Sequence, residues 1–96
     1  MNKAEIKIVE EQINNCWQVA SEIIEEFDMY GGGPEEEENR ACEELEKMQE
    51  LFGDHNLPWQ FKERIFGEIM SFVMHDNSGF GDCLMDLIMD AVCIAK

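Results

Sequence analysis

The sequence predicts an all-α protein, a small four-helix antiparallel bundle with a long N-terminal helix, in which residues 1–96 form a single helical domain. Apolar residues recur three and four positions apart along most of the chain, and this spacing places them on one face of a helix. The intervening segments are short and contain glycine or proline, which favours antiparallel packing of consecutive helices. The apolar share of 45% is large enough for a core despite the high charge.

The first helix is predicted over residues 2–30. Asn2 followed by Glu5 is typical of a capped helix start. The glycines at 31–33 predict its end, because glycine tolerates the left-handed conformation that terminates many helices. At about 1.5 Å per residue the helix would be roughly 40 Å long, enough to project beyond the bundle or to pair with a second copy. Its apolar stripe consists of Ile6, Val9, Ile13, Cys16, Ala20, Ile23, Phe27 and Tyr30.

The second and third helices each follow a proline, which suits the first position of a helix. Four glutamates at 35–38 follow Pro34 and fill a first turn, where negative charge complements the exposed backbone amides. Gly53 is the predicted stop of the second helix, and the third runs from Pro58 to about Met74. The predicted inward positions are Ala41, Leu45, Met48 and Phe52, then Phe61, Ile65, Ile69, Phe72 and Val73, with Trp59, Phe66 and Met70 widening the third helix's face.

The segment His75–Gly81 has the composition of a turn, and Asp82 is predicted to open the fourth helix. Apolar residues again recur at helical spacing in it, and they are numerous for a helix that buries only one face. This surplus favours either a homodimer or a groove for a partner. The predicted inward positions of the fourth helix are Leu84, Leu87, Ile88, Ala91, Ile94 and Ala95.

Charge restricts the classes of partner. Twenty-two acidic and seven basic residues give a net charge of −15, which repels phosphate backbones and anionic membrane surfaces. The sequence therefore argues against direct nucleic-acid binding and against a membrane role, and no apolar run approaches the roughly 20 residues of a membrane span. A basic protein or a divalent cation is the natural complement.

Twelve of the acids lie between residues 22 and 50, against Arg40 and Lys47 alone, so this segment carries −10 of the net charge of −15. A solvated surface is one interpretation, although mixed signs would serve solubility better. The other is a negative surface that steers a basic partner and imitates the phosphate track of a nucleic acid. The candidate residues for binding such a partner are Glu22, Glu25, Glu26, Asp28, Glu35, Glu36, Glu37 and Glu38.

The fourth helix adds three candidate partner-binding acids four positions apart, Asp82, Asp86 and Asp90. Two pairs of methionines share that spacing. In one interpretation the aspartates mark the solvent side and the methionines fill the core. In the other, the methionines form an exposed patch rimmed by acids, and methionine is frequent at such adaptable binding surfaces. The methionines are Met70 and Met74 in the third helix and Met85 and Met89 in the fourth.

The aromatic residues Trp17, Trp59 and Phe80 are expected to plug the core, or to anchor an interface if exposed. Three of the four cysteines are expected to face the core. The N-terminus lacks the pattern of a signal peptide, so we expect reduced thiols and a cytoplasmic location rather than a disulfide framework. The four cysteines are Cys16, Cys42, Cys83 and Cys93.

Catalytic and metal-binding motifs are poorly represented, so neither a cofactor nor a metal is expected and the protein is not expected to be an enzyme. There is no C-x-x-C pair, and the segment from Asp76 fails as a calcium hand because Phe80 and Leu87 occupy ligand positions. A magnesium-dependent nucleotide pyrophosphohydrolase is the remaining enzymatic alternative. It would use the E-x-x-E spacings Glu22/Glu25 and Glu43/Glu46.

In charge and in helical architecture, though in no particular motif, the chain resembles small acidic helical inhibitors such as bacteriocin-nuclease immunity proteins and phage anti-defence proteins. The resemblance implies an inhibitor that occupies a basic, nucleic-acid-binding enzyme. The hypothesis is therefore that the protein binds and inhibits or sequesters a basic macromolecule by negative-charge mimicry. A homodimeric adaptor or structural module is the alternative.

Overall fold

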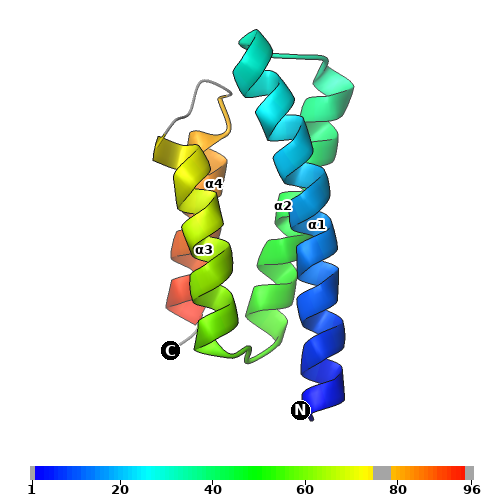
Figure 1. The fold of residues 1–96 in the computed structure, drawn as a ribbon, viewed down its shortest axis with the longest axis vertical. Helices are drawn as coiled ribbons and strands as arrows, with labels where there is room; N and C mark the ends of the chain where they lie inside the picture. Colours follow the sequence, from blue (N-terminus) through cyan, green and yellow to red (C-terminus); the bar gives the residue numbers. More distant parts are fainter. Residues whose placement is uncertain (1, 75–78, 95–96) are drawn as a thin grey trace.

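The computed structural model describes residues 2–74 and 79–94, with side chains as far as Met89. These residues form four helices: α1 (Lys3–Tyr30), α2 (Glu35–Asp54), α3 (Trp59–Met74) and α4 (Gly81–Ile94). Consecutive helices run antiparallel, and α1 packs on α2, α2 on α4, and α4 on α3 (Figure 1). The predicted four-helix bundle with a long first helix is confirmed, and the N-terminal end of α1 projects beyond the other helices (Figure 1).

The helix ends follow the predicted caps at both ends of α1 and differ at the prolines and at Gly53. The Asn2 side chain accepts a hydrogen bond from the backbone N–H of Glu5 at 2.9 Å, and Gly31 ends α1 in the left-handed conformation at φ 72°. The two prolines immediately precede their helices instead of occupying the first helical position, and the Pro34 carbonyl accepts from the N–H of Glu38 at 3.1 Å. The second helix continues through Gly53 to Asp54, because a single glycine does not suffice to end it.

Most of the core comes from the predicted stripes, and two of the three aromatic plugs belong to it. Phe72, Val73 and Ile88 are only partly buried, whereas Ile24 and Leu57 are buried without having been predicted. Trp17 and Phe80 are buried, whereas Trp59, at the first position of α3, is 58% exposed. Tyr30 is 76% exposed because it ends α1. The stripe prediction is wrong for this residue. The buried apolar side chains are Val9, Ile13, Trp17, Ala20, Ile23, Ile24, Phe27, Ala41, Leu45, Met48, Phe52, Leu57, Phe61, Ile65, Phe66, Ile69, Phe80, Leu84 and Leu87.

The cysteines lie nearer the surface than predicted. Cys16 and Cys42 are only partly buried and Cys83 is exposed. These three thiols are free, and each lies at the margin of a helix–helix contact rather than at its centre. Residues 75–78 of the predicted turn His75–Gly81, Ala95, and the side chains of Asp90, Ala91, Cys93 and Ile94 lie outside the described residues.

The described helices do not combine the length and apolar character that crossing a membrane requires. The fourth helix begins at Gly81, one residue before the predicted Asp82. The molecule is elongated, with extents of 42 × 21 × 16 Å. The surfaces on which a partner can bind are therefore the two ends of the bundle and the seams between its helices.

Candidate protein-binding surface

The turn between α1 and α2 places two groups of candidate acids at one end of the molecule (Figure 1). One group occupies the last turns of α1 and the other the first turn of α2. Most of these side chains are exposed, while Asp28 and Glu37 are partly buried. We call this surface the acidic end, and it comprises Glu22, Glu25, Glu26, Asp28, Glu35, Glu36, Glu37 and Glu38.

Little of this charge is neutralised within the described chain. The two ion pairs join Lys47 to Glu44 at 3.3 Å and Arg64 to Glu68 at 3.9 Å. Neither involves Glu22, Glu25, Glu26 or residues 35–38. Their carboxylates therefore present a field of one sign to the solvent at this end.

Of the three α4 aspartates, Asp82 and Asp86 have side chains that the structure describes. Asp82 and Asp86 are exposed, and Asp86 lines a hollow of about 220 Å³ together with Cys42, Glu46 and Cys83. Burial, followed by the charge of the neighbouring Cys83, raises the pKa of the Cys42 thiol. The Cys42 and Cys83 thiols thus line the same hollow at the α2–α4 seam.

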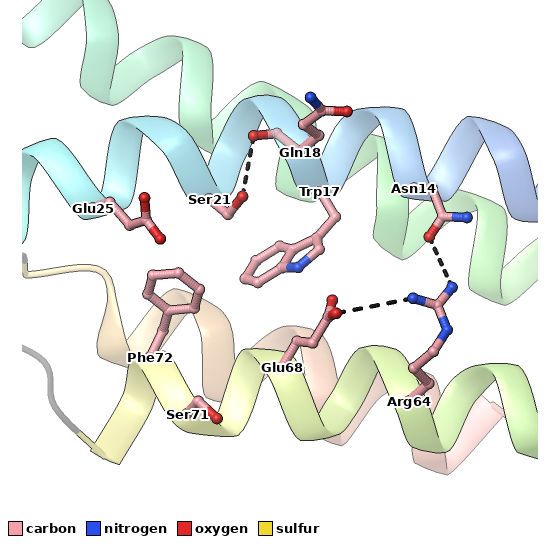
Figure 2. A pocket seen from close by; sticks show the side chains of 9 residues that line it. All are labelled: Asn14, Trp17, Gln18, Ser21, Glu25, Arg64, Glu68, Ser71 and Phe72. Carbon is pink, nitrogen blue, oxygen red and sulfur yellow. Dashed lines mark hydrogen bonds and ion pairs between the residues drawn. The ribbon is translucent and has the colours of Figure 1, made fainter.

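A groove runs between α1 and α3, which do not pack as closely as the other neighbours (Figure 2). Its volume is about 480 Å³, and its residues recur three and four positions apart on both helices, so each helix offers one flank. We call it the α1–α3 groove. It is lined by Asn14, Trp17, Gln18, Ser21 and Glu25 from α1 and by Arg64, Glu68, Ser71 and Phe72 from α3.

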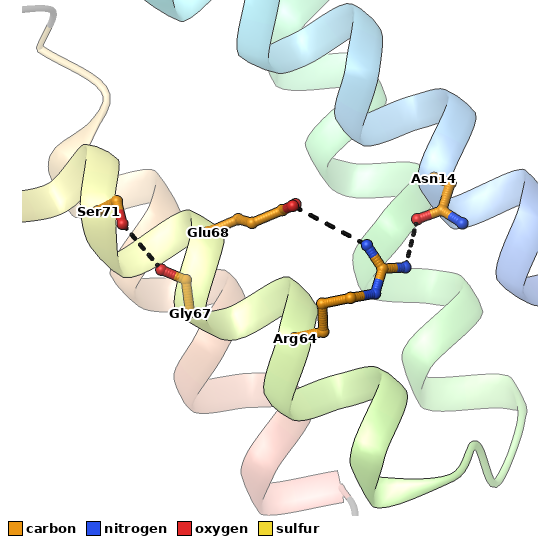
Figure 3. A network of polar contacts seen from close by, with 5 residues as sticks. All are labelled: Asn14, Arg64, Gly67, Glu68 and Ser71. Atoms are coloured by element: carbon orange, nitrogen blue, oxygen red, sulfur yellow. Dashed lines mark hydrogen bonds and ion pairs between the residues drawn. The ribbon is translucent and has the colours of Figure 1, made fainter.

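One end of the groove holds the protein's own guanidinium group (Figure 3). Arg64 crosses from α3 and donates through Nη2 to Oδ1 of Asn14 at 3.0 Å. Its Nη1 lies 3.9 Å from Oε1 of Glu68, and its Cζ lies 5.3 Å from the centroid of the Phe61 ring. An amide oxygen, a carboxylate and an aromatic ring therefore lie beside this cation, whose side chain is 52% exposed. We call this part the Arg64 half.

The other part of the groove, the Glu25 half, has aromatic and acceptor groups. The Trp17 and Phe72 rings meet edge to face with centroids 5.4 Å apart, and the Glu25 carboxylate faces the Phe72 ring from α1 (Figure 2). The Ser21 hydroxyl donates to the carbonyl of Gln18 at 3.1 Å, and the Ser71 hydroxyl donates to that of Gly67 at 3.2 Å.

The groove continues into the acidic end. A second hollow of about 250 Å³ shares Glu25, Ser71 and Phe72 with it and adds Asp28. Of the predicted partner-binding acids, the structure thus brings Glu25 and Asp28 to the groove, while Glu22 and Glu26 lie on the exposed side of α1.

Four methionines predicted to fill core gaps are exposed, so that part of the interpretation is wrong, while Asp82 and Asp86 do lie on the solvent side. Met85 has the lowest exposed fraction of the four, 36%, and Met74 has the highest, 76%. They lie on α3 and α4 beside positions that face the core, and Met48 of α2 is the methionine that is buried. The described residues therefore favour the alternative interpretation of an exposed methionine-rich surface, formed by Met70, Met74, Met85 and Met89.

Sequence reasoning missed the groove. The sequence feature that corresponds to the groove is a line of polar residues on α1 at 14, 18, 21 and 25, beside the buried Trp17. A second line of polar residues lies on α3 at 64, 68 and 71. Such lines are typical of solvated helix flanks. The sequence does not state that these two flanks face one another across an open seam.

Within the described residues, no group of three or more histidine, cysteine, aspartate or glutamate side chains is arranged to hold a metal ion. No known protein family matches the chain, and neither curated proteins nor solved structures gave a significant match.

Proposed function

We propose that this protein binds a basic macromolecule, in particular a nucleic-acid-binding protein, and inhibits or sequesters it through the acidic end. The observation that supports this is the arrangement of charge. Seven of the eight carboxylates of the acidic end lack an ion pair with any described residue, and all eight lie on the end of one compact body. A field of one sign accelerates encounter with an opposite charge and rejects like-charged partners.

The partner binds the exposed side chains of the acidic end and the aspartates of α4. Carboxylates spaced along two adjoining helix ends resemble a row of phosphates. The nucleic-acid-binding site of a basic partner can therefore bind them in place of phosphates. Asp82 and Asp86 extend the negative surface along α4, and Asp90 follows at the same spacing in the sequence. The proposal involves no catalysis, no cofactor and no direct nucleic-acid contact. It places the protein in the cytoplasm, where free thiols stay reduced.

The test is affinity capture from host extract with elution by a salt gradient, followed by binding measurements with the purified partner. The variant E22Q/E26Q/E36Q removes three charges from the acidic end. The matched control E11Q/D54N/E63Q removes three exposed charges elsewhere, so both have the same net charge. We expect the first variant to weaken binding at least about tenfold and the control about twofold or less.

Binding should also fall steeply with added salt, because the attraction acts between solvent-exposed charges. A partner whose affinity is indifferent to ionic strength would contradict the proposal. Equal losses in the two triple variants would also contradict it, since they would mean that net charge matters and its placement does not.

A homodimeric adaptor is the second candidate, and the exposed methionine-rich surface on α3 and α4 favours it. Two copies that meet there would cover apolar side chains that one bundle leaves in water. Sedimentation velocity at micromolar concentration separates the two candidates, because a strict monomer would exclude the dimer. The magnesium-dependent pyrophosphohydrolase receives no support from the described carboxylates, which do not gather into a metal site.

A further inference from the structure

The Glu25 half of the α1–α3 groove offers hydrogen-bond acceptors and no free donor hydroxyl. A serine hydroxyl has one hydrogen. In Ser21 and Ser71 that hydrogen is directed to a carbonyl of the same helix, at 3.1 and 3.2 Å. Both oxygens can therefore only accept a bond from a molecule in the groove, as can the carboxylate of Glu25. A ligand that satisfies these three acceptors must donate to them, while the indole N–H of Trp17 is a donor in the same part of the groove.

The aromatic residues of the groove further restrict the class of ligand that fits. Trp17 and Phe72 line the same part of the groove (Figure 2), and aromatic ring faces attract cations. Trp17 is buried and Phe72 only partly buried, so Phe72 offers the more accessible ring. The facing carboxylate of Glu25 adds a full negative charge, and Asp28 lies in the adjoining hollow. A cation with several N–H donors and a planar, stackable shape satisfies all these groups. The guanidinium of arginine has five such donors and no acceptor.

The Arg64 half supplies an internal example of the same recognition. There the protein's own guanidinium bonds to Asn14, approaches Glu68 and lies over an aromatic ring. The Glu25 half repeats a carboxylate, oxygen acceptors and aromatic rings farther along the same two helices (Figures 2 and 3). It has no basic residue among its lining side chains, so the cation is the component that a partner would bring.

We propose that the Glu25 half of the α1–α3 groove, formed by Trp17, Ser21, Glu25, Ser71 and Phe72, binds an arginine side chain of the basic partner. This inference rests on the proposed function and specifies its contact surface. The whole groove, with both halves together, has a volume of about 480 Å³ and is open to solvent along the seam between α1 and α3. Its continuation toward Asp28 joins the arginine site to the acidic end.

The probes are tetra-arginine amide, tetra-lysine amide and the neutral isostere tetra-citrulline amide, titrated into the full chain at about 20 mM salt, where charge attraction is little screened. The background variant W59F leaves Trp17 as the single tryptophan, so fluorescence reports on the groove. We expect tetra-arginine to change Trp17 emission and to bind about fivefold or more tightly than tetra-lysine, with no binding of tetra-citrulline.

Two comparisons separate the groove from the general field. E25Q and E26Q each remove one charge from the same turn of α1, but only Glu25 lines the groove. We expect E25Q to weaken tetra-arginine binding about fivefold or more and E26Q about twofold or less. The variant S21A/S71A keeps the charge and removes both acceptor hydroxyls, and we expect it to weaken tetra-arginine about threefold while leaving tetra-lysine less affected.

Equal affinities for the arginine and lysine peptides, or equal effects of E25Q and E26Q, would overturn the arginine site while leaving the acidic end as a binding surface. Tetra-arginine binding without a response from Trp17 would also overturn the site. If neither cationic peptide binds at low salt, both the site and the proposed function are wrong.

Discussion

At the scale of single residues, Cys16 has the most perturbed chemistry that the described chain offers. Its thiol lies on α1 beside α2, and its environment raises its pKa from the usual 9.0 to about 11. Burial is the largest cause, a hydrogen bond with Glu44 and the negative charge of that carboxylate act in the same direction, and Lys47 opposes them. The fold therefore favours the neutral thiol, although the residue is only partly buried.

We expect Cys16 to react slowly with iodoacetamide, because the thiolate is the reactive form. At about pH 8 the raised pKa leaves roughly one hundredth of the thiolate that the same cysteine has in the unfolded chain, so alkylation should be about a hundredfold slower. Peptide mapping by mass spectrometry in native buffer and in urea measures the ratio. The variant E44Q should speed the native reaction, and a native rate equal to the unfolded rate would contradict the assignment.

The sign of the accompanying pH dependence follows from the direction of the shift. Because the folded pKa lies above the unfolded value, Cys16 contributes stability that is fully present below pH 9. This contribution is lost as the pH rises from 9 towards 11, where the unfolded chain ionises first.

Residue-level prediction succeeded where helical spacing alone decides burial and failed at the margins of the helices. The stripe of α2, from Ala41 to Phe52, is buried as predicted. Trp59 and Tyr30 are exposed because they lie at helix ends, where no neighbouring helix covers them. The burial of Lys62, which is 2% exposed, was not predicted. The apolar stem of a lysine can pack against the core while its ammonium group stays near water.

At the scale of the helices, the turn from α1 to α2 is held by a contact that the sequence hardly reveals. The glycine run predicted a helix end, and Gly31 provides it through a positive φ. Gly33 has a different role, because the Phe27 ring lies directly against its backbone. That ring also packs on Phe80 with centroids 5.3 Å apart, so the turn is connected to the entry of α4.

We expect G33A to destabilise the protein, because the added Cβ collides with the Phe27 ring and displaces it from Phe80. Overpacking of this kind costs about 1–3 kcal/mol. The matched variant G67A should instead stabilise by about 0.5–1 kcal/mol, since Gly67 lies inside α3 with open space around its Cβ position. Urea unfolding measures both changes, and a G33A protein as stable as G67A would contradict the contact.

The seams between helices were the least predictable elements. Each amphipathic stripe indicates which flank of a helix turns inward, but it does not say which helix becomes the neighbour. The packing of α2 against α4, which brings Cys42 beside Cys83, and the open seam that forms the α1–α3 groove depend on that choice. The position of the acidic end was predictable, because a short turn between consecutive helices brings the acids at the end of α1 next to those at the start of α2.

At the scale of the whole molecule, the net charge of −15 is spread over a body only 42 × 21 × 16 Å in extent. The Debye length at physiological ionic strength is about 8 Å, so many of these carboxylates repel one another within the screening distance. Of the two ion pairs of the described chain, Arg64–Glu68 is exposed and Lys47–Glu44 has an exposed lysine, and surface pairs of this kind contribute little. Repulsion therefore outweighs attraction, and the native state carries an electrostatic penalty that salt can relieve.

We expect the free energy of unfolding to rise with salt, by about 1 kcal/mol between low ionic strength and about 0.5 M potassium chloride, which raises Tm by about 4–8 °C in a domain of this size. Thermal unfolding followed by circular dichroism measures it. The variant E22Q/E26Q/E36Q should gain less from salt than the control E11Q/D54N/E63Q, because it has lost charges from the densest cluster. Stability that falls with salt would mean that attractive pairs dominate, and equal salt responses in the two variants would mean that the acidic end is not where the repulsion concentrates.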